Sequence, residues 1–239
     1  MRRKSCSVAP GILDAARCSQ FISFICATLV IALFGAPSSQ AQTFGPSYSL
    51  TSLTNSGGSI LVGDKLFSHF FVIGDPYASN ITVTALISGN NYGLQFGGGF
   101  VAINNDMDFQ LGYMVDVTNS DNLISGAGLT FNGVVVGTGN GLAEVTEQVI
   151  TNMDIGAPYG QMTVYATQSS SVLATNIPID PPQSYLNLEK DILVDTFTIT
   201  AASSISTINQ YYTQVPEPST IFLVGVGLLS GLMLRRRRH

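Results

Sequence analysis

The sequence predicts an all-β protein with a single antiparallel β-sandwich domain of jelly-roll-like type between two terminal signals. Three features of residues 42–214 support this prediction. Short runs of alternating or β-branched residues recur along the segment, glycine-rich turns separate them, and no stretch combines a helical period with capping signals at both ends. Strands without intervening helices favour a sandwich, with an irregular β-barrel as the alternative. The segment is long enough for one well-cored domain.

Two runs carry the strongest strand signals. Residues 107–117 alternate apolar and polar side chains, which predicts an antiparallel strand with one solvated face. Residues 65–73 are apolar on both faces, which predicts a central strand with Phe67, His69 and Phe71 on the same side. On this pattern we expect His69 to be a hydrogen-bonded core residue, with a general base as the alternative. Further strands are predicted at residues 81–87, 129–131, 144–150, 162–167, 192–200 and 206–212.

Turn-forming residues divide these runs. Ser56-Gly57-Gly58 and Asn132-Gly133 are typical of hairpins or bulges that need a positive φ. The proline-rich segment at residues 177–182 predicts a loop between two strands.

The N-terminal 41 residues have the features of a secretory signal peptide. Four basic residues among the first 17 precede an almost uncharged apolar run at 21–36. Small residues at Ser39 and Ala41 predict cleavage by signal peptidase between Ala41 and Gln42, and an uncleaved N-terminal anchor is the alternative. All three cysteines precede this cut, so the exported domain cannot form a disulfide.

The C-terminal segment 215–239 has three parts. The motif at 215–220 contains two prolines, which make the chain stiff and extended. The apolar run 221–234 predicts a transmembrane helix about 21 Å long, shorter than the roughly 30 Å core of a bilayer. The basic tail at 235–239 predicts a stop signal on the cytoplasmic side, which leaves the domain outside. The residues of the stop signal are Arg235, Arg236, Arg237 and Arg238.

This order of motif, short helix and arginine cluster resembles the PEP-CTERM protein-sorting signal. The motif residues that carry the resemblance are Val215, Pro216, Glu217 and Pro218. The resemblance implies recognition by a membrane-embedded exosortase, cleavage near the motif, and delivery to the cell surface or exopolysaccharide matrix. It makes Glu217 part of a substrate and implies no catalysis by this chain. A stably anchored single-pass protein with an incidental proline-rich stalk is the alternative.

Charge is distributed unevenly along the chain. The whole sequence has a net charge of −5, but residues 42–214 carry 13 acidic residues against Lys65 and Lys190 alone, a net charge of −11. This excludes a nucleic-acid binder that works through a basic face. An acidic surface also repels polyanionic polysaccharide unless divalent cations mediate the contact or the sugars are neutral.

Residues suited to catalysis are scarce in the exported domain. It has one histidine, no cysteine and no arginine, which leaves no serine-hydrolase triad, zinc site or bidentate phosphate clamp. We therefore expect no enzymatic activity. A secreted carbohydrate-active hydrolase with paired carboxylates is the alternative, because Asp and Glu are numerous.

One acidic run suggests a weak calcium site. Asn104, Asp106 and Asp108 alternate, which places their oxygen atoms on one side of an extended segment. The run is not an EF-hand, since Phe109 stands at the position of the loop glycine and Val115 at that of the final glutamate. We expect Asp106 and Asp108 either to bind Ca²⁺ weakly or to be solvated carboxylates at a sheet edge, and we expect no other cofactor.

These features predict an exported, non-enzymatic surface or matrix protein with a structural or adhesive role in an exopolysaccharide layer. Its expected partners are signal peptidase, an exosortase-like protease, the inner membrane during transit, and extracellular polysaccharide, but not nucleic acid.

Overall fold

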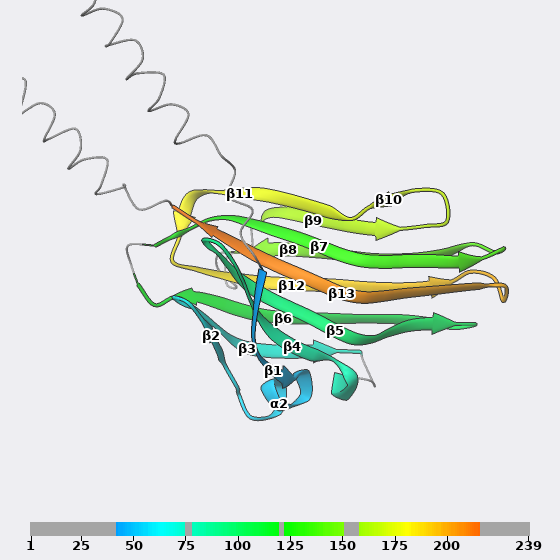
Figure 1. The fold of residues 1–239 in the computed structure, drawn as a ribbon, viewed down its shortest axis with the longest axis horizontal. Helices are drawn as coiled ribbons and strands as arrows, with labels where there is room; N and C mark the ends of the chain where they lie inside the picture. Colours follow the sequence, from blue (N-terminus) through cyan, green and yellow to red (C-terminus); the bar gives the residue numbers. More distant parts are fainter. Residues whose placement is uncertain (1–41, 75–77, 120–121, 151–157, 216–239) are drawn as a thin grey trace, which may run out of the picture. The chain divides into compact units, whose positions relative to one another are not determined.

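Two antiparallel sheets packed face to face make up the described part of the chain, residues 42–74, 78–119, 122–150 and 158–215 of a computed structural model (Figure 1). Sheet A has the strand order β1-β4-β5-β13-β7-β11, and sheet B the order β10-β9-β8-β12-β6-β3-β2. The predicted all-β sandwich is confirmed, with two separate sheets in place of the barrel alternative. The jelly-roll-like type stays a prediction.

The elements have the following bounds. Sheet A contains β1 (Gln42–Ser49), β4 (Thr82–Ser88), β5 (Asn91–Ile103), β7 (Ile124–Gly137), β11 (Ala174–Gln183) and β13 (Ala201–Gln214). Sheet B contains β2 (Ile60–Val62), β3 (Lys65–Ile73), β6 (Asp106–Val117), β8 (Gly141–Ile150), β9 (Pro158–Ala166), β10 (Ser171–Val172) and β12 (Tyr185–Thr196). Two short helices, α2 (Leu50–Asn55) and η1 (Ala78–Asn80), lie between strands.

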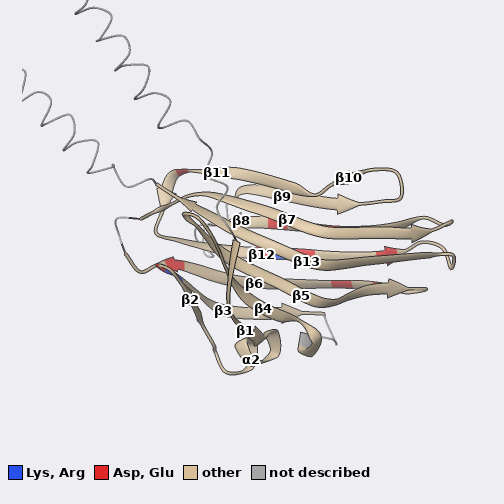
Figure 2. Cartoon of the chain, in the orientation of Figure 1, with Lys and Arg blue, Asp and Glu red and all other residues tan. Residues whose placement is uncertain are grey.

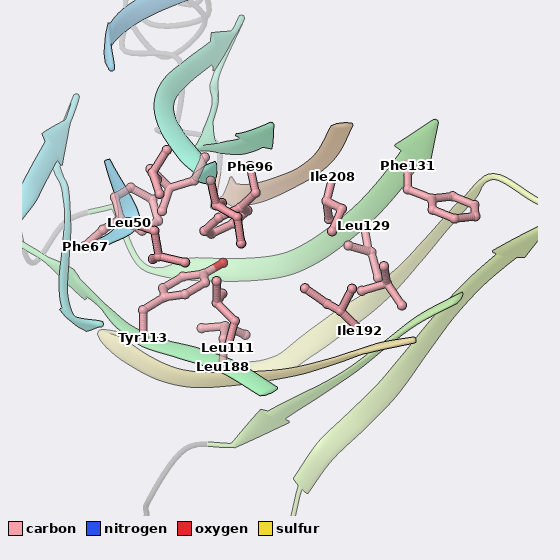
Figure 3. Packing of buried hydrophobic residues seen from close by; sticks show 14 of the residues in the cluster. Leu50, Phe67, Phe96, Leu111, Tyr113, Leu129, Phe131, Leu188, Ile192 and Ile208 are labelled. Atoms are coloured by element: carbon pink, nitrogen blue, oxygen red, sulfur yellow. The ribbon is translucent and has the colours of Figure 1, made fainter. Parts of the chain in front are cut away.

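The core fills the space between the sheets with side chains from alternate strand positions. Phe109, Leu111 and Tyr113 of β6 are buried as the alternation predicted. In Figure 3, Leu111 and Tyr113 of sheet B face Phe96 of sheet A. Aromatic rings of the two sheets pack against one another. The ring centroid of Phe67 in sheet B lies 6.0 Å from that of Tyr113 in the same sheet and 5.7 Å from that of Tyr212 in sheet A.

Helix α2 was absent from the sequence prediction. Its N-cap is Ser49, whose hydroxyl accepts a hydrogen bond from the Ser52 amide at 3.1 Å. At its other end Gly57 has φ +60°, and the Gly58 amide donates to the Leu53 carbonyl at 2.9 Å. The segment Ser56-Gly57-Gly58 therefore ends a helix and does not form a hairpin. Six residues are too few for a helical period to show in the sequence.

The prediction that His69 is a core residue is wrong. His69 has φ +54°, and the pairing of β3 with β6 shifts register between Ser68 and Phe71. This β-bulge breaks the alternation, so that Phe67 and Phe70 are buried whereas His69 is exposed. The imidazole Nδ1 of His69 lies 2.9 Å from the hydroxyl of Ser68.

The predicted loop at residues 177–182 is also wrong, because the segment belongs to β11. This strand lies at the edge of sheet A and, among the strands that the structure describes, pairs with β7 alone, with a register shift between Pro178 and Gln183. Prolines are tolerated there because an edge strand leaves one side of its backbone without a ladder partner.

Two other boundaries differ from the sequence prediction. Asn132-Gly133 lies inside β7, where the irregularity falls on the opposing strand β13 between Ile205 and Thr207. The strand predicted at 192–200 ends at Thr196, and β13 begins at Ala201.

Both ends of the domain lie at the same end of the sandwich. Gln42 pairs with Ser88, next to the hairpin whose Tyr92 pairs with Tyr212 near the end of β13. The opposite end carries the connections 138–140, 167–170 and 197–200, about 45 Å away along the 14 residues of β13.

The terminal predictions fall outside the described residues. These are the signal peptide with Ala41, motif residues Pro216, Glu217 and Pro218, the helix at 221–234 and the arginines 235–238. Among the residues that the structure describes, no helix is long and apolar enough to cross a membrane.

Candidate functional site

The outer face of sheet B collects most of the carboxylates of the domain. Strand alternation turns these side chains away from the core on the central strands β6, β8 and β12. Of the ten acidic residues in the described part of the chain, seven lie on this face: Asp106, Asp108, Asp116, Glu144, Glu189, Asp191 and Asp195. Figure 2 shows acidic positions in red along β6, β8 and β12.

The registers align polar side chains in rows across the face. Asp191 of β12 lies opposite Gln110 of β6 and Thr146 of β8. In the next row Glu189 lies opposite Gln148, which in turn pairs with Gln161 of β9. These rows surround a pocket of about 220 Å³ in which every lining side chain is polar: Gln110, Thr146, Gln148, Gln161, Glu189 and Asp191.

The carboxyl group of Asp191 titrates abnormally. Partial burial raises its pKa, and the charge of Asp108 together with a hydrogen bond between the two carboxyl groups raises it further. A hydrogen bond between two carboxyl groups requires a proton on one of them, so this contact favours the protonated form of Asp191.

No lysine or arginine compensates these charges on the outer face within the described residues, because both lysines of the domain point inward and are fully buried. Lys65 contacts Asp64 at 2.7 Å, the Asn122 carbonyl at 3.1 Å and Gln214 at 2.9 Å. Lys190 forms an ion pair with the buried Glu147. In the described residues, the outer face of sheet B therefore carries carboxylates and neutral side chains but no lysine or arginine, in agreement with the acidic composition of the domain.

Aromatic residues stand at both margins of the acidic rows. The ring of Phe71 covers Gly112 so closely that an added Cβ would meet it at 2.2 Å. On the other margin Tyr165 of β9 lies opposite Glu144, and its hydroxyl is 3.2 Å from that of Ser170.

A second hollow lies at the end of the sandwich that is remote from Gln42 and Val215. It has a volume of about 480 Å³, and its lining combines polar residues with the ring of Phe197, whose exposed fraction is 61%. The lining residues are Asn140, Gly141, Thr167, Gln168, Ser169 and Phe197.

The residues predicted to bind calcium lie near one edge of the acidic face. Asp106 and Asp108 are exposed on β6, with Asp106 opposite Asp195 of β12. Asn104 has φ +58° and lies between β5 and β6, so it stands in a turn and not in an extended segment. In the described residues no group of three or more His, Cys, Asp or Glu side chains is placed to hold a metal ion. Weak calcium binding by Asp106 and Asp108 stays a prediction.

Sequence reasoning did not single out Glu189 and Asp191. Their spacing of two was a usable signal, since it places both on one face of a strand. What the spacing could not show is that β12 lies between β6 and β8, which brings the acidic residues of three strands together.

The last described residues lead into the sorting segment. Val215 follows β13, and its amide donates to the Leu123 carbonyl at 3.1 Å. Residues 214–238 match the PEP-CTERM protein-sorting motif. The match confirms the resemblance found in the tail and indicates export and sorting to the cell surface. It covers about a tenth of the chain and says nothing about what the β domain binds.

Comparison with curated proteins gives no match. Among solved structures, TmCBM61 in complex with β-1,4-galactotriose is 13% identical, with 63% of this chain and 89% of that chain covered and a TM-score of 0.25. The family 11 xylanase from Neocallimastix patriciarum is 7% identical, with coverage of 72% and 100% and a TM-score of 0.26. The family 11 carbohydrate-binding module from Clostridium thermocellum is 7% identical, with coverage of 75% and 91% and a TM-score of 0.20. Likeness at these scores carries no argument about ligand or activity.

Proposed function

We propose that this chain is an exported surface protein whose domain binds an uncharged polysaccharide along the outer face of sheet B. It would serve as an adhesive or structural component of an exopolysaccharide layer. The observation that carries the proposal is the pocket on this face, in which all six lining residues are polar and stand in rows across four strands.

The chemistry of the face suits sugar hydroxyl groups. Each hydroxyl donates and accepts a hydrogen bond, and carboxylates and side-chain amides such as those of Glu189 and Gln148 offer the acceptors and donors that it needs. The aromatic rings at the margins, Phe71 and Tyr165, offer flat apolar surfaces next to polar groups. The excess of carboxylates repels anionic polysaccharides. The face therefore favours a neutral glycan, or an anionic glycan held to the carboxylates by divalent cations.

We propose further that the domain has no catalytic activity. The hydrolase alternative has one supporting observation, because the raised pKa of Asp191 beside Glu189 resembles a general acid next to a second carboxylate. The pocket, however, has a volume of about 220 Å³, below the roughly 300–1,000 Å³ of typical ligand sites. A hollow of this size does not enclose a glycosidic bond with its flanking sugars.

Affinity electrophoresis of the full chain through gels that contain a polysaccharide tests the binding proposal. We expect retardation by an uncharged β-glucan or galactan and none by alginate in the absence of calcium. Gln148→Ala and Glu189→Gln should each weaken binding by about tenfold, because each removes a hydrogen-bonding group from the face.

Gln95→Ala is the matched control, since Gln95 is a glutamine on the outer face of β5 in sheet A. Equal loss of binding in the control, or retardation by none of the uncharged glycans, contradicts the proposed face. Release of reducing ends by the wild type but not by Asp191→Asn would favour the hydrolase.

Processing needs a separate test. Mass spectrometry of the protein recovered from the cell surface should give Gln42 as the N-terminus and a C-terminus close to the Pro-Glu-Pro motif. An intact arginine tail on the surface protein would instead show a stably anchored protein.

A further inference from the structure

A charged and polar cluster lies in the interior of the sandwich, on the side of sheet B opposite the acidic face. Lys190 of β12 is fully buried, forms an ion pair with Glu147 of β8, and donates a hydrogen bond to the Oε1 atom of Gln210 at 2.7 Å. Gln210 belongs to β13, so the cluster connects sheet B with sheet A. Neither the acidic face nor the proposed glycan binding uses these residues.

The surroundings make Lys190 a candidate nucleophile. Complete burial lowers its pKa well below the ordinary value of a lysine, because the interior disfavours the ammonium form. The ring of Tyr113 covers it, with the Nζ atom 5.8 Å from the ring centroid. A neutral lysine amine in such a site reacts readily with carbonyl groups.

Its two neighbours provide the other parts of an acyl-transfer site. Apart from the ion pair with Lys190, no polar contact to another described residue is made by either carboxylate oxygen of Glu147. The Nε2 atom of Gln210 likewise has no hydrogen-bond acceptor there. The carboxylate is therefore available to exchange a proton with Lys190, and no hydrogen bond to another described residue holds the Nε2 group of Gln210 in place.

We propose that Lys190 and Gln210 become joined by an amide bond between the Nζ atom of Lys190 and the Cδ atom of Gln210, with Glu147 as the proton carrier. The bond is an internal cross-link between the two sheets. The proposal does not depend on glycan binding.

The reaction balances without an oxidant or a cofactor. The Lys190 ammonium gives a proton to Glu147, and the lone pair of the amine attacks the Cδ atom of Gln210. The new bond forms between Nζ of Lys190 and Cδ of Gln210, and the bond between Cδ and Nε2 of Gln210 breaks. Glu147 gives its proton to the departing Nε2 and then takes the second proton from Nζ of Lys190. One molecule of ammonia leaves, and Glu147 ends protonated as it was after the first transfer. The fold holds the Lys190 amine next to the Gln210 amide, so no bimolecular encounter is needed, and burial excludes water that would hydrolyse the amide.

Lys65 shows why the reaction is specific to Lys190. It too meets a glutamine of β13, Gln214, and a carboxylate, Asp64. The carbonyl of Asn122 is a third acceptor for the Lys65 ammonium. Its carboxylate partner Asp64 is partly exposed, with a relative accessibility of 15%. Three acceptors hold the Nζ atom of Lys65 in place, and its carboxylate partner is not fully buried, so Lys65 is an internal control.

Peptide mapping of the full chain by mass spectrometry tests the cross-link. Chymotryptic cleavage after Leu, Phe and Tyr places Lys190 in peptide 189–193, Gln210 in 198–211 and Glu147 in 143–159. We expect 189–193 and 198–211 to be recovered as one species whose mass is lower than their sum by one ammonia, and trypsin to leave the bond after Lys190 intact while it cuts after Lys65.

The alternative outcomes are distinct. Recovery of 189–193 and 198–211 only as separate, unmodified peptides overturns the proposal. A species that joins 189–193 to 143–159 with the loss of water also overturns it, because Glu147 would then be the acyl group. The variant Glu147→Gln should give unjoined peptides, and Gln148→Ala, which changes the neighbouring outward residue, should retain the cross-link. The wild-type map decides the question even where Glu147→Gln does not fold.

Discussion

Sheets A and B share one core but present opposite kinds of outer surface. The six strands of sheet A contain a single charged residue, Asp180, whereas the outer face of sheet B carries seven carboxylates. Near its remote end the outer face of sheet A exposes aliphatic side chains of β5 and β7, namely Val101, Ile103, Val134 and Val136. Most inward-facing residues of both sheets are apolar because they pack in the same core. The difference in charge between the sheets lies in the outward-facing residues, which do not contact the core.

The acidic face also has an energetic cost, which supports a functional origin. Asp106 and Asp195 are direct cross-strand partners, and like charges in that position are destabilising. The same sheet supplies the buried charges of the interior, while sheet A supplies only neutral partners such as Gln210 and Tyr212.

The largest expected effect concerns the inner side of sheet B. Lys190→Met or Glu147→Leu alone should lower the free energy of unfolding by about 3–5 kcal/mol, because each leaves an unpaired charge in the core. The double variant should be more stable than either single one. Denaturant titration of the three proteins measures this, and additive losses would contradict a coupled pair.

A smaller loss is expected where the sheets meet through two tyrosines. The hydroxyl groups of Tyr113 and Tyr212 lie 2.9 Å apart and are buried. Tyr212→Phe should cost about 1–3 kcal/mol, because the hydroxyl of Tyr113 loses its partner in the core. Adding Tyr113→Phe should restore part of the loss in thermal or denaturant unfolding, and a further full loss would show that the pair is not coupled.

Calcium is expected to act on the outer side only, and weakly. If Asp106 and Asp108 bind Ca²⁺ with a millimolar dissociation constant, ten millimolar calcium stabilises the domain by about 1 kcal/mol. The thermal midpoint should be higher with calcium than with chelator in the wild type and in the control variant Asp180→Asn, which lies in sheet A. The two midpoints should be equal in Asp106→Asn. Equal midpoints in the wild type would exclude the site.

The smallest effect is a pH dependence of the acidic face. Because the pKa of Asp191 is raised from its ordinary value of 3.8 in the folded state, the folded protein binds more protons than the unfolded chain just above pH 3.8. Stability from this group is therefore present at low pH and lost as the pH rises through the folded pKa. The difference in unfolding free energy between wild type and Asp191→Asn should show this trend, and Asp108→Asn should weaken it. A trend of opposite sign would mean that the pKa is depressed.

Local patterns predicted the strands well where each strand is regular. The alternation in β6 identified its buried residues, since that strand pairs without a register shift with β12. In β3 the same reasoning misplaced His69, because a bulge changes which side chains face the core without leaving a mark in the composition. For β11 the prolines predicted a loop, and only the position of the strand at the edge of sheet A makes them acceptable.

The candidate site was accessible to sequence reasoning only in part. The spacing of Asp106 and Asp108 showed that they share a face, but the four strands that form the pocket are up to about 80 residues apart in the chain.

Three properties could be predicted from the amino-acid sequence: the all-β class, the sorting motif at the C-terminus and the acidic character of the domain. Composition, short-range periodicity and a contiguous motif are local properties of the chain. The tertiary structure alone decided that the carboxylates of β6, β8 and β12 share one face and that Lys190 meets Glu147 and Gln210 across two sheets. Strand order is set by pairing and packing between distant segments, and no local pattern in the chain contains that information.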